Sequence, residues 1–269
     1  MRLTEPQVHH FATFGFLIFR QLFSPAEMGR YLREMEAGLE ARRQDLKPEA
    51  AEKAKARPWS PLLDERTPFI ASLVDDPRFA AAAEQLAGKP MLPWGADGNV
   101  YAGDTKWHPD AYSLGYAGVK FLIYADPLNA TNGALRVIPG SHREPFHSQV
   151  SPAVHIIPDV ESVYGVREDQ LPCFVFDSRP GDVLAFNVGL WHSSFGGSGY
   201  RRMGTVMFYE DPATPEATAA VTHDWAYAHR NYSSRYHGQF YPASWRARHP
   251  RQVKRMAELG VLDTPGAEA

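Results

Sequence analysis

Residues 107–136 read WHPDAYSLGYAGVKFLIYADPLNATNGALR and carry the pattern that decides the fold. The stretch begins with His108-Pro109-Asp110, in which an imidazole and a carboxylate stand two positions apart. Side chains two positions apart point to the same side of an extended segment, so His108 and Asp110 can offer two ligands to one metal ion. An iron(II) site with a facial triad takes two histidines and one carboxylate. This arrangement predicts a third ligand from a histidine on a distant strand.

Short apolar runs separated by Gly, Pro, Asn and Asp fill the sequence around this stretch and after it. The pattern predicts strands at residues 98–103, 118–125, 134–138, 155–158, 183–188 and 202–210. Many short strands with turn signals between them favour a β-sandwich or barrel over a parallel α/β sheet. The Asn132-Gly133 pair supplies the positive φ angles of a tight turn within this region.

The first 90 residues predict helices around one buried strand at residues 15–19. Thr4 is a candidate N-cap for a short helix, and Ser24-Pro25-Ala26-Glu27 is a capping box that starts a helix reaching about Arg43. A third helix is expected from Arg78 to Ala87. Residues 44–57 are polar and form either a solvated excursion or a substrate lid.

The composition indicates an ordinary soluble protein. The chain has 269 residues, 44% of them hydrophobic, and a formal net charge of -3, which gives no sign of a nucleic-acid or membrane-surface partner. Its single cysteine, Cys173, excludes an intramolecular disulfide and a cysteine-rich zinc site. The sequence has neither a signal-peptide pattern nor an apolar run of about 20 residues, so we expect a cytoplasmic location.

Four blocks of the sequence together resemble one family. They are LTEPQVHHFATFGFLIFRQLFSPAEM (residues 3–28), WHPD (107–110), NGALRVIPGSHR (132–143) and PGDVLAFNVGLWH (180–192), the last followed by an arginine. This set and its order are similar to the phytanoyl-CoA dioxygenase family of iron(II)/2-oxoglutarate oxygenases. The resemblance spans residues 3–208, and the tail after about Pro212 has no counterpart in it.

The resemblance implies a mainly β fold with flanking helices, namely a double-stranded β-helix, the jelly roll of the cupin-like proteins. Two facing antiparallel sheets would hold iron between them. The whole chain would then be one domain, with N-terminal helices in residues 1–90, a jelly-roll core at about 91–211 and an aromatic, helical tail at 212–269. Within the tail, a helix is expected from about residue 250 to 259.

The resemblance also assigns roles to individual residues. His108 and Asp110 match the family's HxD metal ligands, and His192 matches its distal histidine ligand. Arg201 matches the arginine that pairs with the far carboxylate of 2-oxoglutarate, with Arg202 as the alternative. Ser194 matches a position that can hydrogen-bond the cosubstrate.

Lys120 is a further candidate at the same site. It shares one strand face with Leu122 and Tyr124. If that face points inward, Lys120 helps to bind a carboxylate of cosubstrate or substrate. If the face points outward, Lys120 is a solvated surface residue.

The activity implied by the resemblance uses Fe(II), 2-oxoglutarate and O2 to hydroxylate an unactivated C–H bond of a small molecule, with release of succinate and CO2. Desaturation or ring chemistry is a related outcome, and the presence of Asp110 argues against halogenation. Two alternatives remain, a non-catalytic jelly-roll binding module and a non-redox metal enzyme of the cupin type. The family name does not imply an acyl-CoA substrate.

Substrate access is expected at loops near one end of the jelly roll. The candidates for this rim are residues 44–66, 111–118 and 148–173, with the C-terminal tail as the alternative. An anionic substrate group could be met by Arg57, Arg66 or Arg167. His142 is expected to be structural rather than a metal ligand.

Overall fold

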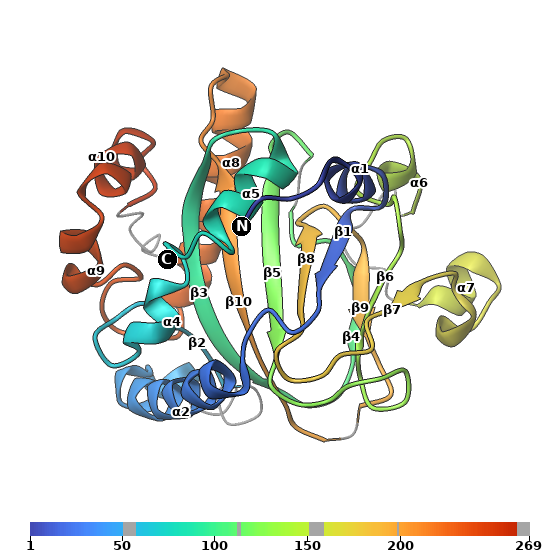
Figure 1. The fold of residues 1–269 in the computed structure, drawn as a ribbon, viewed down its shortest axis with the longest axis horizontal. Helices are drawn as coiled ribbons and strands as arrows, with labels where there is room; N and C mark the ends of the chain where they lie inside the picture. The colour runs from blue at the N-terminus through green and yellow to red at the C-terminus, as the bar shows by residue number, and fades with distance from the viewer. Residues whose placement is uncertain (51–57, 112–113, 151–158, 198, 263–269) are drawn as a thin grey trace.

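Short apolar runs from both halves of the chain pair into two facing antiparallel sheets (Figure 1). The computed structural model describes residues 1–50, 58–111, 114–150, 159–197 and 199–262. The six-stranded major sheet has the order β1 (Phe16–Phe19), β8 (Val183–Asn187), β5 (Gly118–Tyr124), β10 (Arg201–Glu210), β3 (Met91–Tyr101) and β2 (Trp59–Pro61). The minor sheet has the order β4 (Thr105–His108), β9 (His192–Ser194), β6 (Leu135–Val137) and β7 (Phe174–Val175). The predicted jelly-roll class is confirmed.

Strand β10 organises the major sheet because it pairs with β3 on one side and β5 on the other. Thr205 lies opposite Asp97 of β3 and Leu122 of β5. Arg201, four residues earlier on the same strand face, reaches Ser194 in the minor sheet. Because strand side chains alternate, the odd-numbered residues of β10 face the space between the sheets. Apolar side chains that pack in this space include Phe16, Leu122, Tyr124, Leu135, Val137, Leu184 and Phe186.

Helices cover the opposite, outer face of the major sheet. The N-terminal helices are α1 (Glu5–Phe14), α2 (Pro25–Arg42), α4 (Pro68–Ser72) and α5 (Ala80–Ala87). Gly204 of β10 permits the close approach of α2, because a Cβ atom at this position would lie 1.8 Å from the Tyr31 hydroxyl. The absence of a side chain at one strand position therefore sets the distance between helix and sheet.

The predicted starts are confirmed for two of the three N-terminal helices that the sequence predicted. Thr4 and Ser24 both form complete capping boxes. Helix α5 begins at Ala80, two residues later than expected. The Asp76 carboxylate binds the backbone and guanidinium of Arg78 instead of capping a helix there.

The strand predictions are correct for β5 and β10, too short for β3 and incomplete for the short strands. Strand β3 begins at Met91, seven residues before the predicted start at 98. The strands that sequence reasoning missed are β2, β4, β7 and β9, each of two to four residues. The strand expected at 155–158 lies outside the described residues. The remaining short elements are η1 (Arg43–Asp45), η2 (Pro48–Ala50), α6 (Phe146–Val150), α7 (Val160–Tyr164) and η3 (Glu168–Gln170).

The C-terminal tail is helical and packs against the core. It contains α8 (Pro215–Ser233), α9 (Ala243–Arg248) and α10 (Pro250–Glu258), of which only α10 was predicted. Trp225 of α8 contacts the ring of Tyr209 at the end of β10, with ring centroids 5.5 Å apart. The aromatic residues of the tail that are buried include Trp225, Tyr232, Tyr236, Phe240, Tyr241 and Trp245. Helix α8 therefore closes one end of the space between the sheets.

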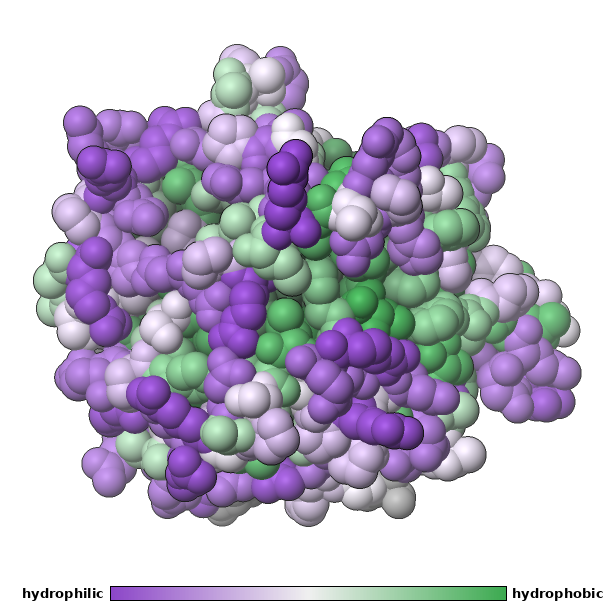
Figure 2. Space-filling view, in the orientation of Figure 1, coloured by the Kyte–Doolittle hydropathy of each residue, from purple (hydrophilic) through white to green (hydrophobic). Residues whose placement is uncertain are grey.

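The surface is polar over most of the face seen in Figure 2, with one apolar strip below α1 and along edge strand β1. Phe14, Phe16, Ile18 and Phe174 are among the residues that line this shallow groove. Within the ranges that the structure describes, no helix combines the length and the apolar character needed to cross a membrane.

Candidate metal centre and cosubstrate pocket

Two histidines and one aspartate meet between the sheets. His108 ends β4 and His192 begins β9, and the two residues are direct partners across this antiparallel pair. Asp110 follows His108 by two residues, and its backbone N–H donates to the carbonyl of Val188. One ligand atom from each of His108, Asp110 and His192 lies within 4.8 Å of the others. The three side chains predicted from the sequence are thus brought together.

Backbone carbonyls fix the two imidazole rings in a form suited to metal binding. Nδ1 of His108 lies 2.6 Å from the carbonyl oxygen of Lys106, and Nδ1 of His192 lies 2.9 Å from that of Leu190. Because a carbonyl oxygen only accepts, each Nδ1 is the protonated nitrogen and donates. The Nε2 lone pair of each neutral ring is left for a metal ion.

The electrostatics keep two of these ligands, His192 and Asp110, in the protonation states that a metal requires. Burial, followed by repulsion from His108, lowers the pKa of His192 to about 3. Burial alone would raise the pKa of Asp110, but the charges of Lys120, His192 and His108 hold it well below its ordinary value. Near neutral pH the site therefore offers a neutral His192 imidazole and an ionised carboxylate.

Lys120 of β5 faces inward, which answers the question that the sequence left open. Its ammonium nitrogen lies 3.0 Å from Oδ2 of Asp110, and its side chain is 16% exposed. The cation is compensated by the carboxylate, so its burial is not costly. Lys120 thus contacts the candidate metal ligand directly.

Arg201 occupies a buried position between the sheets. Its residue is 3% exposed, and Nη2 donates to the carbonyl of Gly103 at 2.6 Å. Its buried Nη1 has no hydrogen-bond partner among the described residues. A buried guanidinium nitrogen without an acceptor is unusual in a native protein and indicates a place for an anionic group.

Two glycines make room for this guanidinium. A Cβ atom at Gly133 would lie 2.0 Å from Nη1 of Arg201, and one at Gly197 would lie 1.7 Å from the same atom. Gly133 belongs to the NGALR block and has a positive φ of 94°. The sequence predicts Gly133 as a turn residue only, and its contact with Arg201 was missed.

Arg202 has a different environment. It is half-exposed and pairs with Asp126 at 2.6 Å and with Glu36 at 2.8 Å. These carboxylates fully engage Arg202 at the surface. Of the two neighbouring arginines, only Arg201 reaches the space beside the candidate metal ligands.

Ser194 lies between Arg201 and strand β4. The Nη2 atom of Arg201 is 3.4 Å from Oγ of Ser194, which is also 3.0 Å from Oγ1 of Thr105. Thr105 was not predicted as a site residue. Three residues before His108 on a regular strand, Thr105 would face the opposite side, but the register of the β4–β9 pair shifts between these two residues.

A small cavity adjoins Asp110 on the side of α8. Its volume is about 160 Å³. The walls come from β2, β3, β10 and α8, and the residues that line it include Trp59, Trp94, Asp110, Tyr209, Asp224 and Tyr227. Apart from Asp110, none of these was singled out as a site residue. Asp224 did carry a signal, since it interrupts the apolar side of a helical stretch between Val221 and Trp225.

Other sequence candidates lie elsewhere or have other partners. His142 packs beside Gly15 with its Nε2 3.3 Å from the carbonyl of Ala12, which agrees with a structural role. Arg66 binds Asp64 at 2.6 Å, and Arg167 binds Asp169 in an exposed pair. Arg57 lies outside the described residues. Neither Arg66 nor Arg167 is among the residues that line the cavity beside Asp110.

The sequence matches a family model described as phytanoyl-CoA dioxygenase over residues 11–203. An ectoine dioxygenase from Bordetella bronchiseptica is 29% identical over 219 residues, covering 71% of this chain and 70% of that protein. The ectoine dioxygenase of Bordetella parapertussis is 28% identical over the same shares of the two chains.

Solved structures share the fold at lower sequence identity. EctD from S. alaskensis, solved with 2-oxoglutarate and 5-hydroxyectoine, has a TM-score of 0.59 and 20% identity, covering 77% of this chain and 76% of that chain. The non-heme α-ketoglutarate-dependent epimerase SnoN from nogalamycin biosynthesis also has a TM-score of 0.59, with 16% identity, 77% of this chain and 82% of that chain covered. At these identities the structural similarity establishes the jelly-roll fold.

Proposed function

The chain belongs to the phytanoyl-CoA dioxygenase family, and from that premise we propose that it hydroxylates an unactivated C–H bond of a small molecule at the site described above. The family match and the ectoine dioxygenase relatives make it an Fe(II)- and 2-oxoglutarate-dependent dioxygenase. The proposal concerns the reaction outcome and the residues that carry it. The observations that support it best are the convergence of three ligand atoms and a buried nitrogen of Arg201 that has no partner among the described residues.

We assign iron(II) to His108, Asp110 and His192. The donor set of two imidazoles and one carboxylate suits a facial triad for iron(II), which leaves coordination positions open for other ligands. The carbonyl contacts of the two Nδ1 atoms support this assignment because they direct both Nε2 atoms toward a common point.

We assign the far carboxylate of 2-oxoglutarate to Arg201. The carboxylate would give Nη1 of Arg201 an acceptor that none of the described residues supplies. The Ser194 hydroxyl, 3.4 Å from Nη2, is placed to donate to the same anion. Lys120 is a weaker candidate for the cosubstrate, because its ammonium group is already engaged by Asp110.

Bound iron(II) and 2-oxoglutarate supply the oxidising chemistry that consumes O2, releases succinate and CO2, and oxidises the substrate. The chain's own residues fix the geometry around that chemistry. Arg201 orients the cosubstrate, Lys120 orients the Asp110 carboxylate, and the buried strands beside His192 exclude water. The cavity next to Asp110 holds the substrate within reach of the metal ligands.

The proposed assignment is tested by succinate release from 2-oxoglutarate with Fe(II), ascorbate and air. Wild-type protein should form succinate slowly without substrate, and the Asp110→Ala variant should form none above the protein-free rate. Asp177→Ala, which removes an exposed carboxylate, should behave like wild type. Equal turnover by Asp110→Ala would contradict the ligand assignment.

A further inference from the structure

The cavity beside Asp110 has a chemical character that narrows the substrate class. Its lining includes both Asp110, which we assign as a metal ligand, and Asp224 of α8. A volume of about 160 Å³ is that of roughly five water molecules at about 30 Å³ each. A ligand that fills it is therefore small.

Asp224 places a carboxylate where an apolar side chain would be expected. The residue is 4% exposed and sits on the buried side of α8 next to Trp225. The Tyr116 hydroxyl donates to its Oδ2 at 2.7 Å, and Nδ1 of His223 lies 3.0 Å from its Oδ1. These contacts hold the carboxylate in position at the wall of the cavity. Burial of an acidic group is costly, so an aspartate here calls for a function.

The rest of the cavity wall is aromatic. Trp59, Trp94, Tyr209 and Tyr227 all line it. Trp94 and Tyr209 have ring centroids 6.3 Å apart, and Trp59 is oriented by a 2.9 Å hydrogen bond from its Nε1 to Asp97. Aromatic faces carry a negative quadrupole that attracts organic cations, and several rings around one carboxylate form a typical cation site.

The positive charges of the described residues near the cavity have partners, including Arg235, whose guanidinium carbon lies 5.7 Å from the centroid of the Trp59 ring. Among the described residues, no lysine or arginine lines it. Lys120 pairs with Asp110, and Arg42 pairs with Asp45 and Asp64. An anionic substrate would meet Asp224 with no described lysine or arginine in the cavity wall, whereas a cationic substrate would meet a carboxylate and aromatic rings.

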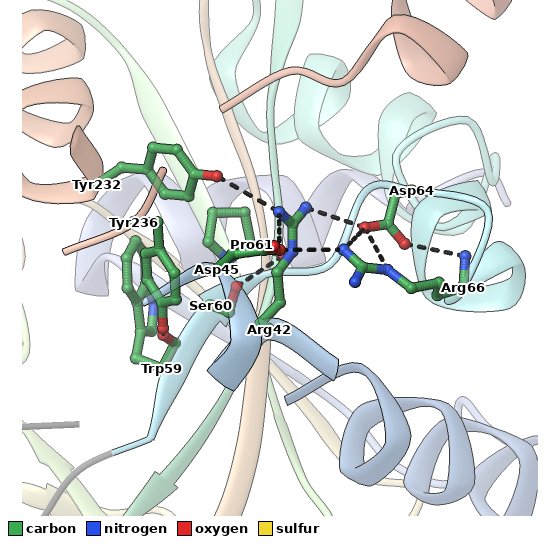
Figure 3. Close-up of polar contacts among 9 residues, drawn as sticks. All are labelled: Arg42, Asp45, Trp59, Ser60, Pro61, Asp64, Arg66, Tyr232 and Tyr236. Atoms are coloured by element: carbon green, nitrogen blue, oxygen red, sulfur yellow. Dashed lines mark hydrogen bonds and ion pairs between the residues drawn. The ribbon is translucent and has the colours of Figure 1, made fainter. Parts of the chain in front are cut away.

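The two walls that carry Trp59 and Tyr227 are tied together by a buried polar network (Figure 3). Arg42 at the end of α2 donates from Nη1 to the Tyr232 hydroxyl of α8 and pairs through Nη2 with Asp64 at 3.0 Å. The hydroxyl of Tyr236 donates to the backbone carbonyl of Trp59. This network fixes β2 relative to α8, so the cavity is formed before a ligand binds, which lowers the entropic cost of binding.

We propose that this cavity binds a small organic cation, such as an amine, an amidine or a quaternary ammonium compound, as the substrate of the dioxygenase. The positive group lies at Asp224 among the aromatic rings, and the opposite end of the molecule faces Asp110. The inference rests on the proposed function, because it takes the cavity beside Asp110 as the substrate site.

Three probes of nearly equal shape and different charge test this proposal. They are choline, its neutral isostere 3,3-dimethylbutan-1-ol, and the anion 3,3-dimethylbutanoate. Binding is measured by calorimetry to full-length protein loaded anaerobically with Co(II) and 2-oxoglutarate. Choline should bind about tenfold or more tightly than the alcohol, and the anion should bind most weakly. Equal or reversed affinities, or no binding of choline at any accessible concentration, would overturn the proposal.

Two variants locate the cation. Asp224→Asn keeps the side-chain shape and should abolish the preference for choline over the alcohol. Tyr227→Leu changes a ring that is 41% exposed, so it should fold normally and weaken choline binding by about three- to tenfold without affecting the alcohol. Asp177→Asn is the matched control, and it should retain the wild-type preference. An unchanged preference in both Asp224→Asn and Tyr227→Leu would place the cation elsewhere and overturn the proposal.

The same samples distinguish a failure of the proposed function from a failure of the proposed substrate class. Co(II) binding to wild type, followed by its visible absorption, tests the metal site independently of any substrate. Intact metal binding without a preference for the cation would refute the substrate class alone. Loss of metal binding by wild type would refute the proposed function itself.

Discussion

The ammonium group of Lys120 lies 3.0 Å from Oδ2 of Asp110, whereas Oδ1 of the same carboxylate lies 3.9 Å from Nε2 of His192. The two oxygens therefore have different neighbours. Oδ1 points toward the imidazoles, where a metal ion would bind, and Oδ2 is held by the lysine. Such a contact fixes the orientation of a metal-binding carboxylate before the metal arrives.

Replacing Lys120 with Met should destabilise the metal-free protein by roughly 2 kcal/mol, because Asp110 loses its counter-ion. The cost is below that of a fully buried pair, since both side chains keep some exposure. Urea unfolding with chelator present measures it. Saturating Co(II) should recover a larger part of the stability in Lys120→Met than in wild type, as the metal becomes the new partner. Equal stability of the two metal-free proteins would show that the ion pair does not contribute.

Arg201 and Arg202 should respond differently to the same conservative change. Arg201→Lys should raise the KM for 2-oxoglutarate at least tenfold, because a lysine cannot reproduce the planar guanidinium fork. Arg202→Lys should change that KM less than twofold, since Arg202 pairs at the surface with Asp126 and Glu36. Initial rates of succinate formation at varied 2-oxoglutarate provide the comparison. Reversed behaviour of the two variants would assign the cosubstrate to Arg202.

The Arg42 network should contribute strongly to stability. Arg42 and Asp64 have side chains that are 8% and 7% exposed, so Arg42→Met leaves a buried carboxylate without one of its partners and should cost about 3 kcal/mol. Arg43→Met is the matched control, because Arg43 forms only an exposed pair with Glu40 and should change stability by less than about 0.5 kcal/mol. Urea denaturation compares the two. Similar midpoints would mean that the network does not fix α2 to the rest of the fold.

His249, which lies in the C-terminal tail, should make the free energy of unfolding depend on pH. Burial alone would lower its pKa, but the hydrogen bonds to Asp75 and to the carbonyl of Trp245 raise the pKa above the ordinary value of 6.5. The folded state therefore binds the proton more tightly than the unfolded state. This contribution is fully present below pH 6.5 and is lost as the pH rises through the higher folded value.

The His249→Gln variant measures that contribution. The difference in unfolding free energy between wild type and variant should be larger at about pH 6 than at about pH 9. Asp75→Asn should remove the same pH dependence, since Asp75 is the charged partner at 2.8 Å. A difference that grows with rising pH would reverse the sign and contradict the assignment.

The sequence predicted those parts of the molecule whose signals are local. The capping boxes at Thr4 and Ser24, the long strands β5 and β10, and the two-residue spacing of His108 and Asp110 each express a single short-range rule. The distal partner His192 and the inward-facing Arg201 came from the family resemblance rather than from any periodicity. The metal and cosubstrate roles of these residues stay predictions until the measurements described here are made.

The parts that were missed depend on contacts between distant segments. The alternation along residues 201–209 does not distinguish Arg201 from Arg202, which differ in the structure because Gly133 and Gly197 leave space on only one side of β10. The Lys120 side chain points inward and finds its partner in Asp110, which lies outside strand β5 and could not be identified as that partner from the sequence. The cavity beside Asp110 requires α8, and the aromatic composition of that tail concealed its helical pattern.

The most direct test of the central claim is an anaerobic titration of the 2-oxoglutarate-loaded protein with Fe(II), followed by the metal-to-ligand charge-transfer absorption of the iron–2-oxoglutarate complex. We expect this absorption to saturate at one equivalent of iron in wild type and in Asp177→Ala, and to be absent in Asp110→Ala and His192→Ala. Saturation at one equivalent with full amplitude in Asp110→Ala or His192→Ala would contradict the claim that His108, Asp110 and His192 hold the iron.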